Sequence, residues 1–100
     1  MPEIGQVAAK VRSKNAGPFW LTIDIFCGTP AAFDQIVNGL STDRVATALG
    51  VDPDVIKRFD IDALNVIKIS LPRPAIQGRA NDRDMHGAGW ASVISELVVN

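Results

Sequence analysis

The sequence predicts an α+β protein, a two-layer sandwich in which about five mostly antiparallel strands carry two helices on one face. Apolar residues recur with a period of two in several short segments, which is typical of half-buried strands. Two segments between them show the 3.6-residue period of helices instead. Since 47% of the 100 residues are apolar, we expect a single domain over residues 1–100 with one hydrophobic core.

The first two strands are predicted on either side of a polar loop. Residues 7–11 alternate in polarity, and residues 21–27 do so more strongly, with an apolar face that ends at Cys27. Residues 12–17 are predicted to form the loop, because Gly17 precedes a proline and both favour a turn. The two strands should therefore be joined by a short connection.

Two helices are predicted next. Thr29 is suited to cap the first helix and Pro30 to begin it. Ser41 or Thr42 is suited to cap the second, which should end at Gly50. The first helix carries a stripe of apolar side chains at helical spacing: Phe33, Ile36, Val37 and Leu40.

Three more strands complete the prediction. Residues 55–61 and 63–71 are predicted strands, which would pair as a hairpin with Asp62 in a tight connection. Lys57 indicates either an edge position or a long side chain whose apolar stem lies along the surface. Residues 93–99 alternate in polarity and predict a closing strand after the polar, glycine-rich segment 75–89. A ferredoxin-like variant is the leading topology, and a swapped-strand or barrel-like dimer is the alternative.

Composition argues against several classes of function. The formal net charge of −1 argues against a general nucleic-acid binder. No apolar run approaches the roughly 20 residues of a membrane-spanning helix, and the amino terminus shows no signal-peptide pattern. A lone cysteine, Cys27, fits a reducing cytoplasm, which is the expected location. With one His and one Cys, we expect no metal site, and no cofactor is predicted.

The polar segment 12–17 is the first candidate site. Backbone N–H groups in such a turn, with two cations beside them, suit a carboxylate or a phosphate. A solvated hairpin connection is the alternative interpretation, because the spacing of a phosphate-binding loop is absent. The ligand-binding candidates in this segment are Arg12, Ser13, Lys14, Asn15 and Gly17.

A second candidate site is the cluster around His86. This side chain titrates near neutrality and is suited to proton transfer, with Asp84 beside it to orient the imidazole. A solvated histidine in a loop is the simpler interpretation. Asn65 and Arg73 are further ligand-binding candidates, although a buried amide at Asn65 fits a structural role better than catalysis.

Trp20 and Phe26 lie on the less apolar face of the second predicted strand. They either cover a second layer or form an exposed patch that meets a partner protein. Cys27, at the end of the apolar face, is predicted to be a small core residue rather than a nucleophile.

A family resemblance runs through nearly the whole chain. It begins with Lys-Val-Arg-Ser-Lys-Asn-Ala-Gly-Pro-Phe at residues 10–19 and Leu-Thr-Ile-Asp-Ile at residues 21–25. It continues with Ala-Leu-Asn-Val at residues 63–66, Leu-Pro-Arg-Pro at residues 71–74 and Asp-Met-His-Gly at residues 84–87. These segments resemble a family of small uncharacterised bacterial proteins whose genes often accompany those of AtuA-like proteins, named for acyclic terpene utilisation.

The order of these segments is also similar to that in the carboxy-terminal ferredoxin-fold domain of AtuA-like proteins. That domain has an Arg-Ser-Gly-Asp-Lys-Gly-Asn loop, where this chain has Lys-Asn-Ala-Gly in place of Gly-Asp-Lys-Gly. The resemblance implies an accessory domain supplied in trans to a larger AtuA-like catalytic protein, in the catabolism of branched or terpenoid acids or their thioesters. It supports these motif positions: Arg12, Ser13, Lys14, Asn15, Asn65, Asp84 and His86.

Three hypotheses of function follow, and they leave open whether the chain is an enzyme. It is an accessory subunit of an AtuA-like protein, or a small lyase or hydratase in which residues 12–17 hold an anion and His86 moves a proton, or a homodimeric module that binds a small anion. Expected partners are the AtuA-like protein, a second copy meeting through Trp20 and Phe26, or a small anion, with no nucleic acid or membrane.

Overall fold

The structure is a computed structural model that describes residues 2–17, 19–72 and 89–99. These ranges form four strands, four α-helices and two short 3-10 helices. The strands are β1 (Lys10–Asn15), β2 (Trp20–Phe26), β3 (Lys57–Ile61) and β4 (Val66–Pro72). The helices are α1 (Ile4–Val7), α2 (Pro30–Gly39), α3 (Thr42–Leu49) and α4 (Trp90–Ser95), with η1 (Pro53–Val55) and η2 (Asp62–Leu64) before β3 and β4.

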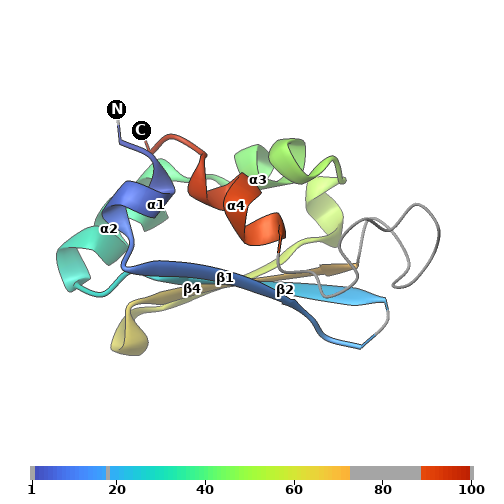
Figure 1. Ribbon diagram of the computed structural model, residues 1–100, viewed down its shortest axis with the longest axis horizontal. Helices are drawn as coiled ribbons and strands as arrows, with labels where there is room; N and C mark the ends of the chain where they lie inside the picture. The colour runs from blue at the N-terminus through green and yellow to red at the C-terminus, as the bar shows by residue number, and fades with distance from the viewer. Residues whose placement is uncertain (1, 18, 73–88, 100) are drawn as a thin grey trace.

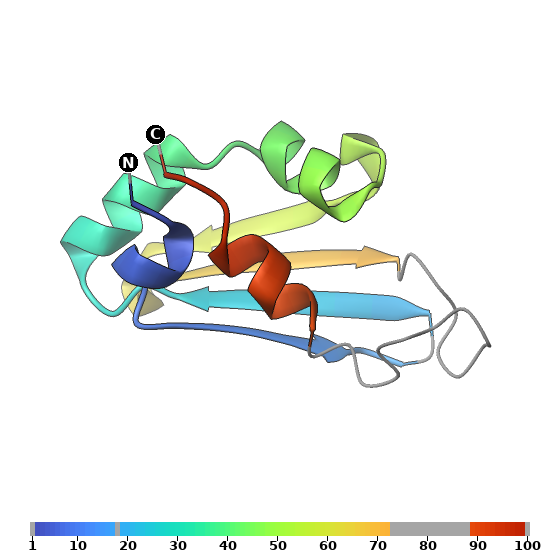
Figure 2. The same cartoon turned by 45° about the horizontal axis from the view of Figure 1, so that its top comes forward.

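The strands form one sheet in the order β1-β2-β4-β3, and every neighbouring pair is antiparallel. The α-helices lie together on one face of this sheet (Figure 1). Figure 2 shows α4 (red) crossing above the sheet on the side of β1, and α4 contacts β1 directly. The predicted two-layer α+β architecture is therefore confirmed, with four strands in the described ranges instead of five.

The core lies between the sheet and the helices. On β2 and β4, alternate side chains face the helices and pair across the strands, and all of them are fully buried: Leu21, Ile23, Ile25, Ile67, Ile69 and Leu71. The helical layer contributes Ile36 of α2 and Leu40, the residue that directly follows α2. It also contributes Val45 of α3 and Ile94 of α4. Burying each such side chain contributes about 1.5–3 kcal/mol, so this layer is the main source of stability.

Both central helices begin and end where the sequence predicts. The Thr29 hydroxyl accepts a hydrogen bond from the Ala32 amide (3.1 Å), and the Ser41 hydroxyl accepts one from the Arg44 amide (3.2 Å). Each cap satisfies one of the amides that a first helical turn leaves without a partner. Gly50 ends α3 in the left-handed conformation, at φ 71°.

The edge strand β3 turns two of its three charged residues, Arg58 and Asp60, toward the helices. The register pairs Arg58 with Ile69, whose side chain is in the core. The Arg58 guanidinium forms a 2.9 Å ion pair with Asp60 and donates hydrogen bonds to the carbonyls of Val37 and Leu40 at the end of α2. A cation at this end of a helix also complements the helix dipole. Arg58 thus ties the edge strand to the helical layer.

Replacing Arg58 by Met is expected to lower the free energy of unfolding by about 1–3 kcal/mol, because several charge-assisted hydrogen bonds are lost. Urea denaturation measures the effect. The control is Lys14→Met, at an exposed position of β1 opposite the uncharged Thr22, for which we expect a change within about 0.5 kcal/mol. Equal losses in the two variants would contradict the role assigned to Arg58.

The first predicted strand is wrong at its amino-terminal end. Residues 4–7 form α1, and β1 begins only at Lys10. Local capping explains the difference, because the Gln6 side chain accepts a hydrogen bond from the Glu3 amide (2.9 Å) and favours a helical turn there. The turn buries Ile4, whose amide donates to the Leu97 carbonyl (2.8 Å).

The predicted closing strand at residues 93–99 is also wrong, because its first part belongs to helix α4. The alternation of polarity in residues 93–99 concealed a stripe of apolar residues at helical spacing, which begins before residue 93. Its members, at i, i+3, i+4 and i+7, all pack in or against the core: Trp90, Val93, Ile94 and Leu97. Only the end of the segment is extended, where Val98 bridges Glu3 and the Val99 amide donates to the Pro2 carbonyl (2.8 Å).

The predicted loop at residues 12–17 is mostly strand. β1 continues to Asn15, and six of its residues pair with β2. An edge strand with one uncovered face accepts polar residues at alternate positions, and for this reason the segment looks like a loop in the sequence. The turn itself is short, with Gly17 at φ 80°.

The order of elements differs from the predicted ferredoxin-like topology. A ferredoxin-like fold begins strand–helix–strand, whereas β1 and β2 form a hairpin and both central helices follow β2. The second hairpin is confirmed, because β3 and β4 are antiparallel neighbours joined through η2. β3 is an edge strand, which is the first of the two interpretations of Lys57. Residues 55–56 and 63–65 lie outside these strands.

Candidate functional site

One face of the sheet is covered by no described residue of the chain. We call it the open face, and it lies opposite the helices (Figure 1). Because neighbouring side chains on a strand point to opposite faces, the strand register assigns its residues. They are Lys10, Arg12, Lys14, Trp20, Thr22, Asp24, Phe26, Lys57, Phe59, Ile61, Val66, Lys68, Ser70 and Pro72.

The open face has an ordered arrangement of charge. Directly opposite residues place Asp24 of β2 between Arg12 of β1 and Lys68 of β4. Opposite charges at such cross-strand positions contribute roughly 0.2–1 kcal/mol per pair. Lys10 and Lys14 flank Arg12 along the edge strand, and both are exposed. The open face is therefore rich in cations around one central carboxylate.

Large apolar side chains are exposed on the same face. Trp20 is 38% exposed and Phe59 53% exposed. The Nζ atom of Lys57 lies 5.5 Å from the centroid of the Trp20 ring, which is a cation–π distance. Phe26 is half-buried at the opposite end of β2 from Trp20, directly opposite Lys10 of β1 and Val66 of β4. The sequence analysis identified Trp20 and Phe26 on this face, but it missed Phe59, Lys57 and Lys68.

A sequence signal for this face does exist. Lys10, Arg12 and Lys14 are two residues apart, so on a strand their side chains share one face. Assigning residues 12–17 to a loop concealed that pattern.

The candidate residues of the first predicted site do not lie together in one loop, because most of them belong to β1 and point to its two faces. Arg12 and Lys14 lie on the open face, while Ser13 and Asn15 lie on the face that carries the helices. Ser13 is buried, and its hydroxyl accepts a hydrogen bond from the Ala91 amide in the first turn of α4 (2.8 Å). Gly89 at the start of that helix has no side chain, so Ser13 supplies the cap from β1.

The variant Ser13→Ala is expected to lower the free energy of unfolding by about 0.5–2 kcal/mol, because the helix amide loses its cap. Thermal unfolding followed by circular dichroism measures this loss. Ser92→Ala, at an exposed position of the same helix, is the matched control and should change stability little. A Ser13 variant as stable as its control would show that the cap contributes nothing.

Asn65 has a structural role, which depends on its backbone conformation and its backbone hydrogen bonds. It is the one non-glycine residue among those described that has a positive φ, 52°, which asparagine tolerates better than most residues. Its carbonyl accepts from the Cys27 amide (2.9 Å), and its own amide donates to the Asp62 carbonyl (3.2 Å). Asn65 therefore caps η2 and links it to β4. Three candidates, Arg73, Asp84 and His86, lie outside the described residues.

Cys27 is 2% exposed, in agreement with the prediction of a core residue. Burial raises the pKa of its thiol, and the negative charge of Asp60 raises it further. Both effects keep the sulfur protonated and unreactive near neutral pH.

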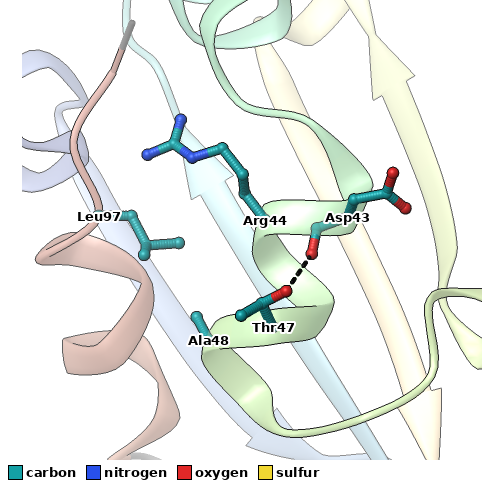
Figure 3. A pocket seen from close by; sticks show the side chains of 5 residues that line it. All are labelled: Asp43, Arg44, Thr47, Ala48 and Leu97. Atoms are coloured by element: carbon teal, nitrogen blue, oxygen red, sulfur yellow. Dashed lines mark hydrogen bonds between the residues drawn. The ribbon is translucent and has the colours of Figure 1, made fainter.

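A pocket of about 330 Å³ lies on the helical side, between α3 and the segment after α4 (Figure 3). Its lining is mainly apolar and includes Ala48 and Leu97. Two of its polar side chains are engaged inside the protein: the Thr47 hydroxyl donates to the Asp43 carbonyl (3.0 Å), and the Arg44 guanidinium donates to the carbonyls of Gly39 and Val98. The sheet separates this pocket from Arg12 and Lys14, so the two do not form one site.

Within residues 2–17, 19–72 and 89–99, no group of three or more His, Cys, Asp or Glu side chains is placed to hold a metal ion. Among the same residues, none of the helices has both the length and the apolar character needed to cross a membrane.

Comparison with known proteins identifies one family. The model of DUF4387, a domain of unknown function, matches residues 4–97. No curated protein and no solved structure matches the chain.

Proposed function

Since this chain belongs to the DUF4387 family, a domain of unknown function, we propose that it is an accessory or small-subunit domain that acts with a larger AtuA-like catalytic protein. The reaction of that partner would be the catabolism of branched or terpenoid acids or their thioesters. The motif resemblance supports the identity of the partner, and the open face supports the mode of action. Association, rather than catalysis by this chain alone, is the proposed role.

The observation that carries this proposal is the exposure of Trp20 and Phe59 on a sheet face that no described residue covers. Aromatic side chains are enriched at protein interfaces, because they bury a large area at a small cost in conformational entropy. Phe26, Ile61 and Val66 are half-buried and extend the apolar area beyond Phe59, toward the end of the sheet opposite Trp20. A partner protein would complete the burial of these side chains.

Co-elution from a sizing column tests the proposal. The full chain, tagged at its amino terminus, is mixed with the AtuA-like protein from the same genome. The Pro2 carbonyl accepts a hydrogen bond from the Val99 amide, and Pro2 is two residues before α1, which lies on the helical side (Figure 1), so a tag there leaves the open face free. We expect one complex in place of two separate peaks, and separate peaks at low and high salt would contradict the proposal.

Two variants locate the contact. The double change Trp20→Ala with Phe59→Ser is expected to reduce complex formation at least about tenfold, as loss of an interface centre does. Val55→Ser is the matched control, since Val55 is 39% exposed but lies in η1, which contacts α3 in the helical layer. A complex that tolerates the double change and is lost in the control would place the interface elsewhere.

A further inference from the structure

Among residues 2–17, 19–72 and 89–99, charge is segregated between the two sides of the sheet, although the net charge of the whole chain is −1. Of the seven described Lys and Arg residues, five lie on the open face, and all five are exposed. Of the nine described Asp and Glu residues, only Asp24 lies there. The two remaining cations, Arg44 and Arg58, are engaged by backbone carbonyls on the helical side. The open face therefore carries a positive field that the overall composition conceals.

A second copy of this chain is a poor occupant of that face. A two-fold symmetric contact would place the same five cations against one another. Like charges brought together in this way cost several kcal/mol. The charge on the face thus disfavours the homodimer that the exposed aromatic residues alone would permit.

Single-stranded nucleic acid fits less well than an acidic protein. Asp24 lies at the centre of the face and would repel a phosphate bound between Arg12 and Lys68. The Lys57 ammonium already lies against the Trp20 ring, on which a base would otherwise stack. Binding of an acidic protein surface requires neither a continuous row of cations for phosphates nor an aromatic ring that is free to stack on a base.

We infer that the open face binds a protein surface in which Asp and Glu side chains surround exposed apolar residues. The cations of β1 and Lys68 would pair with the carboxylates, while Trp20 and Phe59 would pack against the apolar part. Such complementary charge orients two partners and excludes unsuitable ones. The inference rests on the proposed function, because it describes the surface through which the larger protein is recognised.

The affinity of the full chain for the AtuA-like protein, measured by calorimetry at about 50 mM and about 500 mM NaCl, tests this inference. We expect the affinity to fall at least about tenfold at the higher salt. The double change Lys10→Glu with Lys14→Glu should abolish binding at both salt concentrations. These lysines pair with Phe26 and Thr22 rather than with Asp24, so their reversal leaves the central charge row intact. Asp34→Lys, on the exposed side of α2, is the control and should bind as the unmodified chain does.

The outcomes separate the two proposals. An affinity that changes neither with salt nor with the double change at Lys10 and Lys14 would overturn the acidic-surface inference. It would leave the accessory role unaffected. If the AtuA-like protein does not bind at all, the accessory role fails, and poly-L-glutamate becomes the probe. The unmodified chain should then bind it at low salt and the reversed variant should not, and no binding would overturn the inference. Tighter binding of oligo(dT) than of poly-L-glutamate, or a homodimer that the reversal dissociates, would overturn it as well.

Discussion

Replacing Ile23 by Ala is expected to lower the free energy of unfolding by about 2–5 kcal/mol, the largest loss that we expect of any single substitution in this chain. Ile23 is fully buried at the centre of β2, between Ser13 of β1 and Ile69 of β4. The truncation removes apolar contacts and leaves a cavity, because two paired strands hold the backbone on both sides. A domain of this size is stable by only about 5–15 kcal/mol, so the variant is close to unfolding.

Urea denaturation of both proteins measures this loss. Val55→Ala removes two methyl groups at a position that is 39% exposed, and we expect it to cost less than about 1 kcal/mol. Similar losses at the two positions would mean that the layer between sheet and helices is not the main core.

Replacing Gly28 by Ala is expected to lower the free energy of unfolding by about 2–3 kcal/mol. Two effects combine at this position, which links β2 to α2. The backbone has φ 90°, which side chains of L-residues rarely adopt, and an added Cβ would lie 3.0 Å from the Cβ of Ala9. That neighbour belongs to the segment before β1, whose backbone is held by a hydrogen bond from the Ala9 amide to the Phe26 carbonyl (2.9 Å).

Gly17→Ala separates the two effects. Gly17 has a similar φ of 80°, but no atom lies within 4 Å of an added Cβ. It should therefore show only the conformational cost, about 1–2 kcal/mol. Thermal or urea unfolding of both variants provides the comparison. A Gly28 variant no less stable than the Gly17 variant would contradict the close contact with Ala9.

The parts of the fold that could be predicted from the sequence are those in which local signals and burial agree. For α2, the cap at Thr29, the proline at Pro30 and the apolar stripe all indicate the same helix. For β4, alternating isoleucines indicate a half-buried strand beside a matching one. Agreement between these levels explains why α2, α3, β2 and β4 were found close to their observed bounds.

The errors arise where an element is short or lies at the edge of the sheet. Helix α4 has six residues, and its stripe includes Trp90, which lies before the segment that alternates. Strand β1 carries polar residues on both faces, because its outer face is open and its inner face uses Ser13 to cap a helix distant in sequence. No local pattern in the sequence encodes that long-range contact. The tertiary structure therefore determines that this segment is a strand.

The candidate site was predictable only in part. The sequence analysis identified Arg12, Lys14, Trp20 and Phe26 as residues of interest, but it assigned the two cations to a loop and the two aromatic residues to a strand. The register of β1 on β2 brings them to one face. Residues from β3 and β4, such as Lys57 and Lys68, join them through pairings between distant segments, which single-sequence patterns do not reveal.

The central claim is that the open face contacts the larger partner, and fluorine NMR tests it most directly. The chain has two tryptophans, Trp20 on the open face and Trp90 in the helical layer, so labelling with 5-fluorotryptophan gives two resonances. Trp90→Phe assigns them. On addition of the AtuA-like protein, we expect the Trp20 resonance to shift while the Trp90 resonance keeps its position. A complex in which Trp90 shifts and Trp20 does not would contradict the account.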